Sequence, residues 1–177
     1  MQRKWKVLSE TLNAETKKSH AYHTARLTPR ALSSRYYAGR AAIRETTSVV
    51  GGAPVVQAYA ALWRTNWYPK WYELGTVWVG ESLRGNGLYR DLMREAAGLA
   101  PEGANLFLIT REEKIMRTAQ ELGFRSVTTQ TDPKLLLWAS EVGIVCRLPT
   151  SIHPIVGPDV WGTPTDGRRW LFIREGN

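Results

Sequence analysis

The clearest pattern of apolar and polar positions lies in the middle of the chain. The segment from Tyr72 to Val79 mixes β-branched and aromatic residues at near-alternating spacing, which predicts a strand. The turn GESLRGNG follows, and the next residues place Leu88, Leu92 and Ala96 at helical spacing. The central segment therefore predicts a strand that leads through a glycine-rich turn into a helix.

Two helices are predicted upstream of this segment. The stretch from Leu12 to Arg26 is polar and compatible with a helix, and the pattern from Trp5 to Leu8 fits either a first strand or the lead into that helix. Thr28 and Pro29 are typical of an N-cap followed by a proline in the first turn. They predict a second helix that runs to about Ile43.

A β-hairpin is predicted next. Two strand-like runs, from Thr46 to Val50 and from Val55 to Trp63, are joined by the tight turn Gly-Gly-Ala-Pro. The aromatic segment TNWYPKWY then predicts a loop into the central strand, because it carries Pro69. Its large aromatic residues either line a ligand groove or pack this loop onto the core; they are Trp67, Tyr68 and Trp71.

The downstream part begins with a short apolar strand from Asn105 to Thr110 and a helix from Glu112 to Leu122. Gly123 is the expected left-handed stop of that helix, and a strand from Phe124 to Thr129 follows it. The last part predicts a helix from Asp132 to Ser140, a strand from Val142 to Leu148, a proline-rich loop from Pro149 to Gly167, and a final strand from Arg168 to Arg174.

Length and composition favour an ordinary globular protein. A chain of 177 residues with 43% hydrophobic and 23% charged residues fits one domain with its own core. We divide it into a basic helical part (1–44), a core sheet (45–129) and a C-terminal part (130–177). No apolar run approaches the ~20 residues of a membrane span, and the chain start lacks the apolar region of a signal peptide, so we expect a cytoplasmic protein without a membrane partner.

The residue types that bind metals or form disulfides are sparse. Cys146 is the only cysteine, so an internal disulfide is excluded, and a buried, inert thiol is favoured over a nucleophile. His20 and His23 have helical spacing, but no carboxylate or cysteine stands near them in the sequence. The sequence therefore predicts no metal site.

The net charge of +8 is concentrated at the start of the chain, where residues 1 to 40 carry many lysines and arginines against only Glu10 and Glu15. Such a segment attracts nucleic acid, a phosphorylated cofactor or an acidic substrate, and it also occurs as a solvated helical face. Charge alone does not choose among these.

The turn after the central strand has the features of an anion site. Gly85 and Gly87 lack Cβ atoms, so an anion can approach the backbone, and the N–H groups and dipole of the helix start point toward it. A Rossmann fingerprint would need a glycine where the chain has Arg90, and no Lys-Ser or Lys-Thr of a P-loop follows. The ligand is expected to carry phosphate, but neither nucleotide motif fits.

The segment Arg84 to Tyr89 resembles the acyl-CoA signature of the GCN5-related N-acetyltransferases, Arg/Gln-x-x-Gly-x-Gly/Ala, and departs from it at Tyr89. Two flanking features agree: the downstream helix ends in Leu-Gly-Phe, and Glu73 lies eleven residues before Arg84. The resemblance covers residues 72 to about 129. It implies an α/β (α+β) fold with a mixed, mostly antiparallel sheet of about six to seven strands flanked by helices.

The same resemblance implies that acetyl-CoA or coenzyme A binds with its pyrophosphate on this turn and its pantetheine arm along the central strand. The implied cofactor-binding residues are Val77, Trp78, Val79, Arg84, Gly85, Asn86, Gly87, Leu88 and Tyr89. Glu73 becomes the candidate general base, acting directly or through a water, on the strand face of Gly75 and Val77. The alternative is that Glu73 is a solvent-facing strand residue. A helical pair near the N-terminus would form a wall of the acceptor site, with Tyr22, Tyr36 and Tyr37 as candidates.

The family's general acid is missing. A tyrosine commonly lies four residues before the glycine of Leu-Gly-Phe, and this chain has Ala119 there. Thr118, Glu112 and Tyr89 are nearby alternatives, but no motif supports them. The expected outcomes are a substituted acid, a slower enzyme, or a binder without catalysis.

The sequence thus predicts an acyl-CoA-dependent N-acyltransferase, more narrowly an N-acetyltransferase, that moves an acetyl group directly to a primary amine of a small molecule or amino acid. The alternatives are an acyltransferase acting on aminoacyl-tRNA or a protein amine, and a coenzyme A-binding module. A homodimer stays open.

Overall fold

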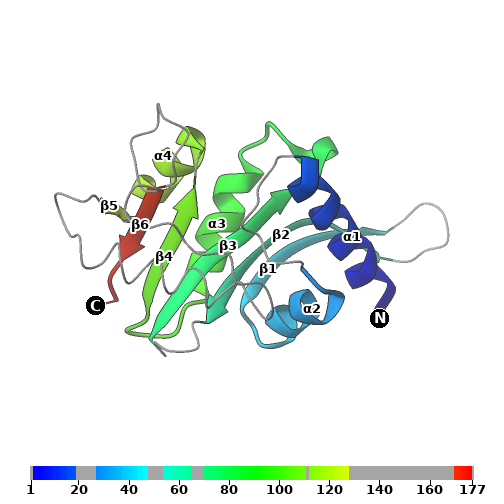
Figure 1. The fold of residues 1–177 in the computed structure, drawn as a ribbon, viewed down its shortest axis with the longest axis horizontal. Helices are drawn as coiled ribbons and strands as arrows, with labels where there is room; N and C mark the ends of the chain where they lie inside the picture. Colours follow the sequence, from blue (N-terminus) through cyan, green and yellow to red (C-terminus); the bar gives the residue numbers. More distant parts are fainter. Residues whose placement is uncertain are drawn as a thin grey trace. The chain divides into compact units, whose positions relative to one another are not determined.

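The computed structural model describes residues 2–18, 27–47, 54–64, 70–110, 112–127 and 170–176. The six strands of the sheet follow the order β1-β2-β3-β4-β6-β5 (Figure 1). The chain forms two compact units, which are described in turn. The first unit comprises Met1–Leu62 and Thr76–Leu99, and the second comprises Trp63–Gly75 and Ala100–Asn177.

The first unit begins with a long helix, α1 (Gln2–Lys18). Trp5, Leu8 and Leu12 are buried at helical spacing, so the segment from Trp5 to Leu8 belongs to the helix and is not a strand. The side chain of Asn13 bonds both backbone groups of Leu27, donating to its carbonyl at 2.9 Å and accepting from its N–H at 3.0 Å. These two hydrogen bonds hold Leu27 against α1, and Leu27 directly precedes the N-cap of the next helix.

Helix α2 (Pro29–Tyr37) packs beside α1 (Figure 1) and starts as predicted. The hydroxyl of Thr28 accepts a hydrogen bond from the N–H of Ala31 at 3.1 Å, and proline occupies the first turn. The predicted end at Ile43 was wrong. The helix stops at Tyr37, Gly39 adopts a left-handed φ of 65°, and the chain then enters a strand.

The predicted antiparallel pair of strands is confirmed, but its first strand begins at Ala41 and not at Thr46, and residues 48–53 lie outside the described residues. Strand β1 (Ala41–Thr47) pairs antiparallel with β2 (Pro54–Arg64), and its first residues are extended because they are opposite buried alanines of β2. Residues 58–62 of β2 are buried without alternation, as expected for a strand covered on both faces. The hydroxyl of Tyr59 donates to the carbonyl of Leu32 at 3.1 Å, which links β2 to α2.

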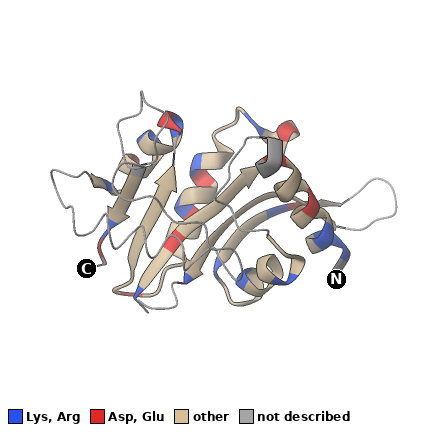
Figure 2. Cartoon of the chain, in the orientation of Figure 1, with Lys and Arg blue, Asp and Glu red and all other residues tan. Residues whose placement is uncertain are grey.

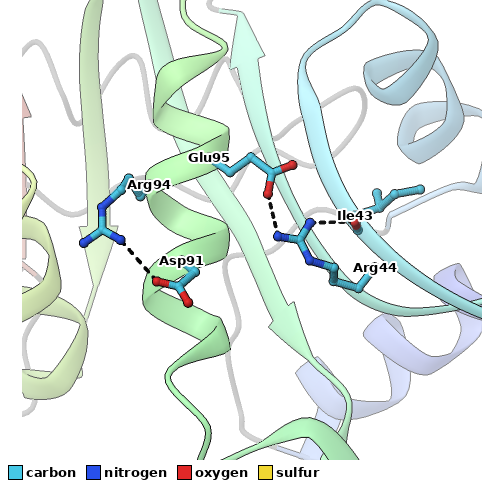
Figure 3. A network of polar contacts seen from close by, with 5 residues as sticks. All are labelled: Ile43, Arg44, Asp91, Arg94 and Glu95. Carbon is cyan, nitrogen blue, oxygen red and sulfur yellow. Dashed lines mark hydrogen bonds and ion pairs between the residues drawn. The ribbon is translucent and has the colours of Figure 1, made fainter.

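Helix α3 (Leu88–Gly98) completes the first unit and contacts β1. Its apolar face is buried through Leu92, Met93, Ala96 and Ala97. Figure 3 shows how its outer face is tied to β1: the guanidinium of Arg44 donates to Glu95 at 2.6 Å and to the carbonyl of Ile43 at 2.9 Å. The hydrogen bond with Glu95 raises the pKa of Arg44.

The central strand β3 (Trp71–Val79) passes from the second unit into the first, with the division after Gly75. In the second unit it pairs in parallel with β4 (Asn105–Thr110), so that Glu73 is opposite Phe107. This ladder ends at Glu73 and Phe107, although both strands continue.

The remaining strands of the second unit, β6 and β5, follow β4 in the sheet order. Strand β6 (Trp170–Arg174) is antiparallel to both of its neighbours, β4 and β5 (Arg125–Val127) (Figure 1). Helix α4 (Glu113–Glu121) ends before Gly123, whose φ of 81° confirms the predicted stop. The core of this unit is mostly apolar, and Glu73 and Thr110 are buried polar residues within it. Its fully buried apolar members include Leu106, Phe107, Leu171, Phe172 and Ile173.

The predicted fold class is confirmed: a mixed, mostly antiparallel sheet of six strands flanked by helices. Several predictions lie outside the described residues, namely those for Cys146, the helix from Asp132, the strand from Val142 and the loop from Pro149 to Gly167. In the part of the chain that the structure describes, no helix is long and apolar enough to cross a membrane.

Candidate active site

The predicted anion turn connects a short 3-10 helix (Glu81–Leu83) to the start of α3. Gly85 and Gly87 have φ values of 92° and 74°, a backbone conformation that glycine adopts without the steric cost paid by other residues. A Cβ at either position would meet no atom within 4 Å. Glycine is therefore required here by backbone conformation, and the space beside the turn is open to a ligand.

Backbone donors are available at this turn. Gly87 is the N-cap of α3 and provides no side-chain cap. Among the described residues, the N–H groups of Asn86, Gly87 and Leu88 find no acceptor. The acidic residue of the first helical turn, Asp91, is bonded to Arg94 at 3.1 Å (Figure 3), which offsets its charge. The start of α3 can therefore accept an anion through its N–H groups and dipole.

Arg84 has a partly structural role. Its Nε donates to the carbonyl of Val79 at 3.0 Å, and its terminal nitrogen contacts the carboxylate of Glu15 at 3.2 Å. The first bond ties the turn to the end of β3, and the second ties it to α1. Because the side chain is 53% exposed, the ion pair adds little stability. The guanidinium can still meet a phosphate at its exposed edge.

The segment of β3 predicted to hold the pantetheine arm starts after an unusual residue. Thr76 has a φ of 53°, which is rare for a β-branched residue and breaks the regular alternation of the strand. The expectation that alternation carries the face of Gly75 on to Val77 therefore stays a prediction. Val77 and Trp78 are half-buried and Val79 is buried.

Glu73 is buried, with 1% of its surface exposed, so the alternative of a solvent-facing strand residue is excluded. Its side chain lies over Gly75, as the sequence predicted. A Cβ built at Gly75 would be 3.2 Å from Oε1 of Glu73. A buried carboxylate on the central strand fits a general base, which remains a prediction.

The position of the missing general acid belongs to the core. Ala119 on α4 is fully buried, and its carbonyl accepts from the N–H groups of Leu122 and Phe124 at 3.0 Å each. Of the alternatives, the Thr118 hydroxyl donates to the carbonyl of Lys114 at 3.2 Å, and Glu112 forms an exposed ion pair with Lys114. Tyr89 is half-buried. The contacts of Thr118 and Glu112 do not mark either residue as the acid.

The candidate aromatic walls are only partly described. Tyr36 and Tyr37 on α2 pack against Trp5, with ring centroids 5.4 and 6.4 Å apart, so they contribute to the packing of the first unit. Trp71 packs against Phe107 at 6.4 Å in the second unit. Tyr22, Trp67, Tyr68, His20 and His23 lie outside the described residues. Within the described ranges, no group of three metal-ligating side chains occurs.

No family model and no curated protein sequence matches this chain. Solved structures do match it. A diaminobutyrate acetyltransferase from Paenibacillus lautus, solved with its substrate L-2,4-diaminobutyric acid and coenzyme A, is 14% identical; the match covers 99% of this chain and 90% of that one, with a TM-score of 0.52. NAA60 from Arabidopsis thaliana, solved with a bisubstrate analogue, is 13% identical over 94% of this chain and 92% of its own, with a TM-score of 0.47. The diaminobutyrate acetyltransferase shares the fold of this protein, and the fold predicted from the resemblance to the GCN5-related N-acetyltransferases is confirmed.

Proposed function

We propose that this protein is an N-acetyltransferase that moves an acetyl group from acetyl-CoA to a primary amine. The observation that carries the proposal is the open glycine turn at the start of α3, with N–H groups that find no acceptor among the described residues, in a chain with the fold of a coenzyme A-bound acetyltransferase. Phosphate is the natural anion for such a turn, and coenzyme A carries a pyrophosphate.

The cofactor site consists of the turn and the end of β3. The backbone of residues 84–89 would hold the pyrophosphate, and the exposed edge of Arg84 adds a positive charge. The strand backbone of Val77 and Trp78 would pair with the amides of the pantetheine arm, as an added strand does. The carbonyl of Val79 already accepts from Arg84, so it belongs to the support of the turn.

Acetyl transfer requires a neutral amine, and Glu73 is the residue that removes the proton from the acceptor ammonium. Bound acetyl-CoA provides an acetyl thioester activated for attack. Glu73 accepts a proton from the acceptor ammonium, directly or through a water, and the amine nitrogen then attacks the thioester carbonyl carbon. The attacked carbon becomes tetrahedral. As it collapses to the amide, the carbon–sulfur bond breaks, the thiolate leaves, and the nitrogen gives up its second proton to the thiolate or to water. Because a thiol has a pKa of only about 8.5, the thiolate can leave without a dedicated acid, which is consistent with alanine at residue 119.

The acceptor is proposed to be a small amine or amino acid. Support comes from the diaminobutyrate acetyltransferase, whose structure holds a diamino acid as substrate. A second candidate function is a coenzyme A-binding module without catalysis. The observation that favours it is Ala119, a fully buried methyl group where the resembled family has a phenol.

The proposal is tested by following free-thiol release from acetyl-CoA with separate pools of amino acids, including L-2,4-diaminobutyric acid, polyamines and other primary amines. Mass spectrometry of the acceptor identifies the acetylated product. The proposal predicts turnover with at least one pool. Thermal stabilisation by coenzyme A without any turnover would support the binding module instead. If coenzyme A produces no thermal stabilisation and no amine pool supports turnover, both functions are overturned.

A further inference from the structure

The side chain of Glu73 is the nearest group that a Cβ at residue 75 would meet. A Cβ at residue 75 would lie 3.2 Å from Oε1, 3.3 Å from Cδ and 3.5 Å from Cγ of Glu73. Residues two apart in a strand are separated by about 6.6 Å, which an extended glutamate side chain can span. The carboxylate therefore lies along the strand over residue 75.

Glycine at residue 75 is required for space. The φ of Gly75 is outside the left-handed region, in contrast to Gly85 and Gly87, so alanine fits its backbone conformation. The constraint is the methyl group that alanine would place against the Glu73 carboxylate. At 3.2 Å from a carbon, the oxygen would have to move by a few tenths of an ångström.

The surroundings leave the carboxylate little freedom to move away. Glu73 is 1% exposed and Gly75 is buried, so the side chain cannot swing into solvent without opening the core. The next residue, Thr76, is held at a φ of 53°. Such a conformation costs on the order of 1–3 kcal/mol and persists only where the surroundings fix it, so the backbone beside Gly75 is fixed as well.

We infer that Gly75 is the positioning residue for the Glu73 general base. The inference rests on the proposed function, in which this carboxylate takes the proton of the acceptor amine. A general base works when it lies within about 2.6–3.2 Å of its proton donor. The missing Cβ lets the carboxylate occupy its place along the strand.

The kinetic test compares Gly75→Ala with Gly98→Ala in two backgrounds, the parent and Glu73→Gln. Gly98 is the matched control, because a Cβ there meets nothing within 4 Å and its φ is not left-handed. Since a misplacement of about 1 Å can cost ~10²-fold in rate, Gly75→Ala should lower kcat by about tenfold, with the KM for acetyl-CoA unchanged. Gly75→Ala should not lower kcat further in Glu73→Gln. Gly98→Ala should leave kcat unchanged in the parent and in Glu73→Gln.

The positioning role would be overturned if Gly75→Ala lowered kcat equally in the parent and in Glu73→Gln, or if it did not lower kcat in the parent. The two proposals fail differently. If Glu73→Gln alone leaves kcat unchanged, the base itself is wrong; if Glu73→Gln lowers kcat and Gly75→Ala does not, only the positioning role is wrong.

A stability measurement tests the same contact without an acceptor. Alanine at residue 73 ends at Cβ and lacks the Cγ, Cδ and Oε1 atoms that a methyl group at residue 75 would meet. Gly75→Ala should lower the Tm of the parent and leave the Tm of Glu73→Ala unchanged. An equal fall in both would show that the methyl group collides with something other than the carboxylate, and would overturn the inference.

Discussion

At the scale of single residues, the proposed chemistry depends on the carboxylate of Glu73 and on the methyl group of Ala119, and both are buried. Glu73 is nearly inaccessible on the central strand, and Ala119 is fully buried on α4. Burying a carboxylate costs free energy unless its surroundings compensate, whereas a buried alanine is ordinary core. A functional role would explain the buried carboxylate, whereas the buried alanine needs no explanation beyond packing.

Glu73→Gln preserves the shape of the side chain and removes the basic carboxylate. We expect kcat to fall by about 10²–10⁴-fold, the range typical of a lost general base, with little change in the affinity for coenzyme A. Steady-state kinetics with the acceptor found by the thiol assay, together with calorimetric titration of coenzyme A, measure the two quantities. An unchanged kcat at neutral pH would exclude this role.

Ala119→Tyr places the phenol of the resembled family in a site that has no room for it. Overpacking a core costs typically 1–3 kcal/mol, so we expect a lower Tm and no gain in thiol release. Gln120→Tyr is the control, because Gln120 is the exposed neighbour on the same helix and should tolerate the ring. A stable Ala119→Tyr protein with faster thiol release would show instead that this position has room for a phenol that takes part in the reaction.

Sequence reasoning reached these residues unevenly. Glu73 was found through its spacing from Arg84, and strand alternation correctly placed it on the face of Gly75. The left-handed Thr76 carries no sequence signal, because nothing in a threonine indicates a positive φ. The burial of Ala119 depends on what covers α4, and a single sequence does not contain that information.

Elements with strong local signals are those that the sequence predicts best. Strand β4 matches its apolar run, and α4 ends before the predicted glycine. The end of α2 was missed because the sequence Ala-Ala-Ile at residues 41–43 suits a helix as well as a strand. These residues form a strand because they pair with β2, which lies about 20 residues further along the chain.

The start of α2 has a local cause that can be tested. The Thr28 hydroxyl satisfies the N–H of Ala31 at the first turn. Thr28→Ala should lower the free energy of unfolding by about 1 kcal/mol, and Thr28→Ser, which keeps the hydroxyl, should lower it much less. Urea unfolding measures both variants. Equal losses would show that the hydroxyl does not cap this helix.

At the scale of the whole molecule, the basic charge near the N-terminus is partly balanced within the first unit. Figure 2 shows acidic positions close to basic ones along α1 and α3. Two lysines of the N-terminal segment form ion pairs in this unit, Lys4 with Glu45 and Lys6 with Glu10. This charge is consistent with a solvated surface or with a phosphorylated cofactor. The single-domain organisation, the cytoplasmic location, a homodimer and a nucleic acid acceptor stay predictions.

The turn is the feature on which the whole account depends, because the proposed cofactor is recognised there. A ligand at one hundred times its Kd stabilises the folded state by about 2.7 kcal/mol, so coenzyme A should raise the Tm of the parent. A valine at residue 87 would itself cost on the order of 1–2 kcal/mol at a left-handed φ, so each protein must be compared with its own unliganded state. Gly98→Ala, at the far end of the same helix, is the control for a glycine substitution in α3.

The most direct measurement is therefore the Tm shift that coenzyme A produces in the parent, Gly87→Val and Gly98→Ala. The account predicts equal shifts in the parent and Gly98→Ala, and loss of most of the shift in Gly87→Val. If coenzyme A protects Gly87→Val as well as the parent, or protects none of the three proteins, then the turn before α3 is not a coenzyme A site and the proposed acetyl transfer loses its basis.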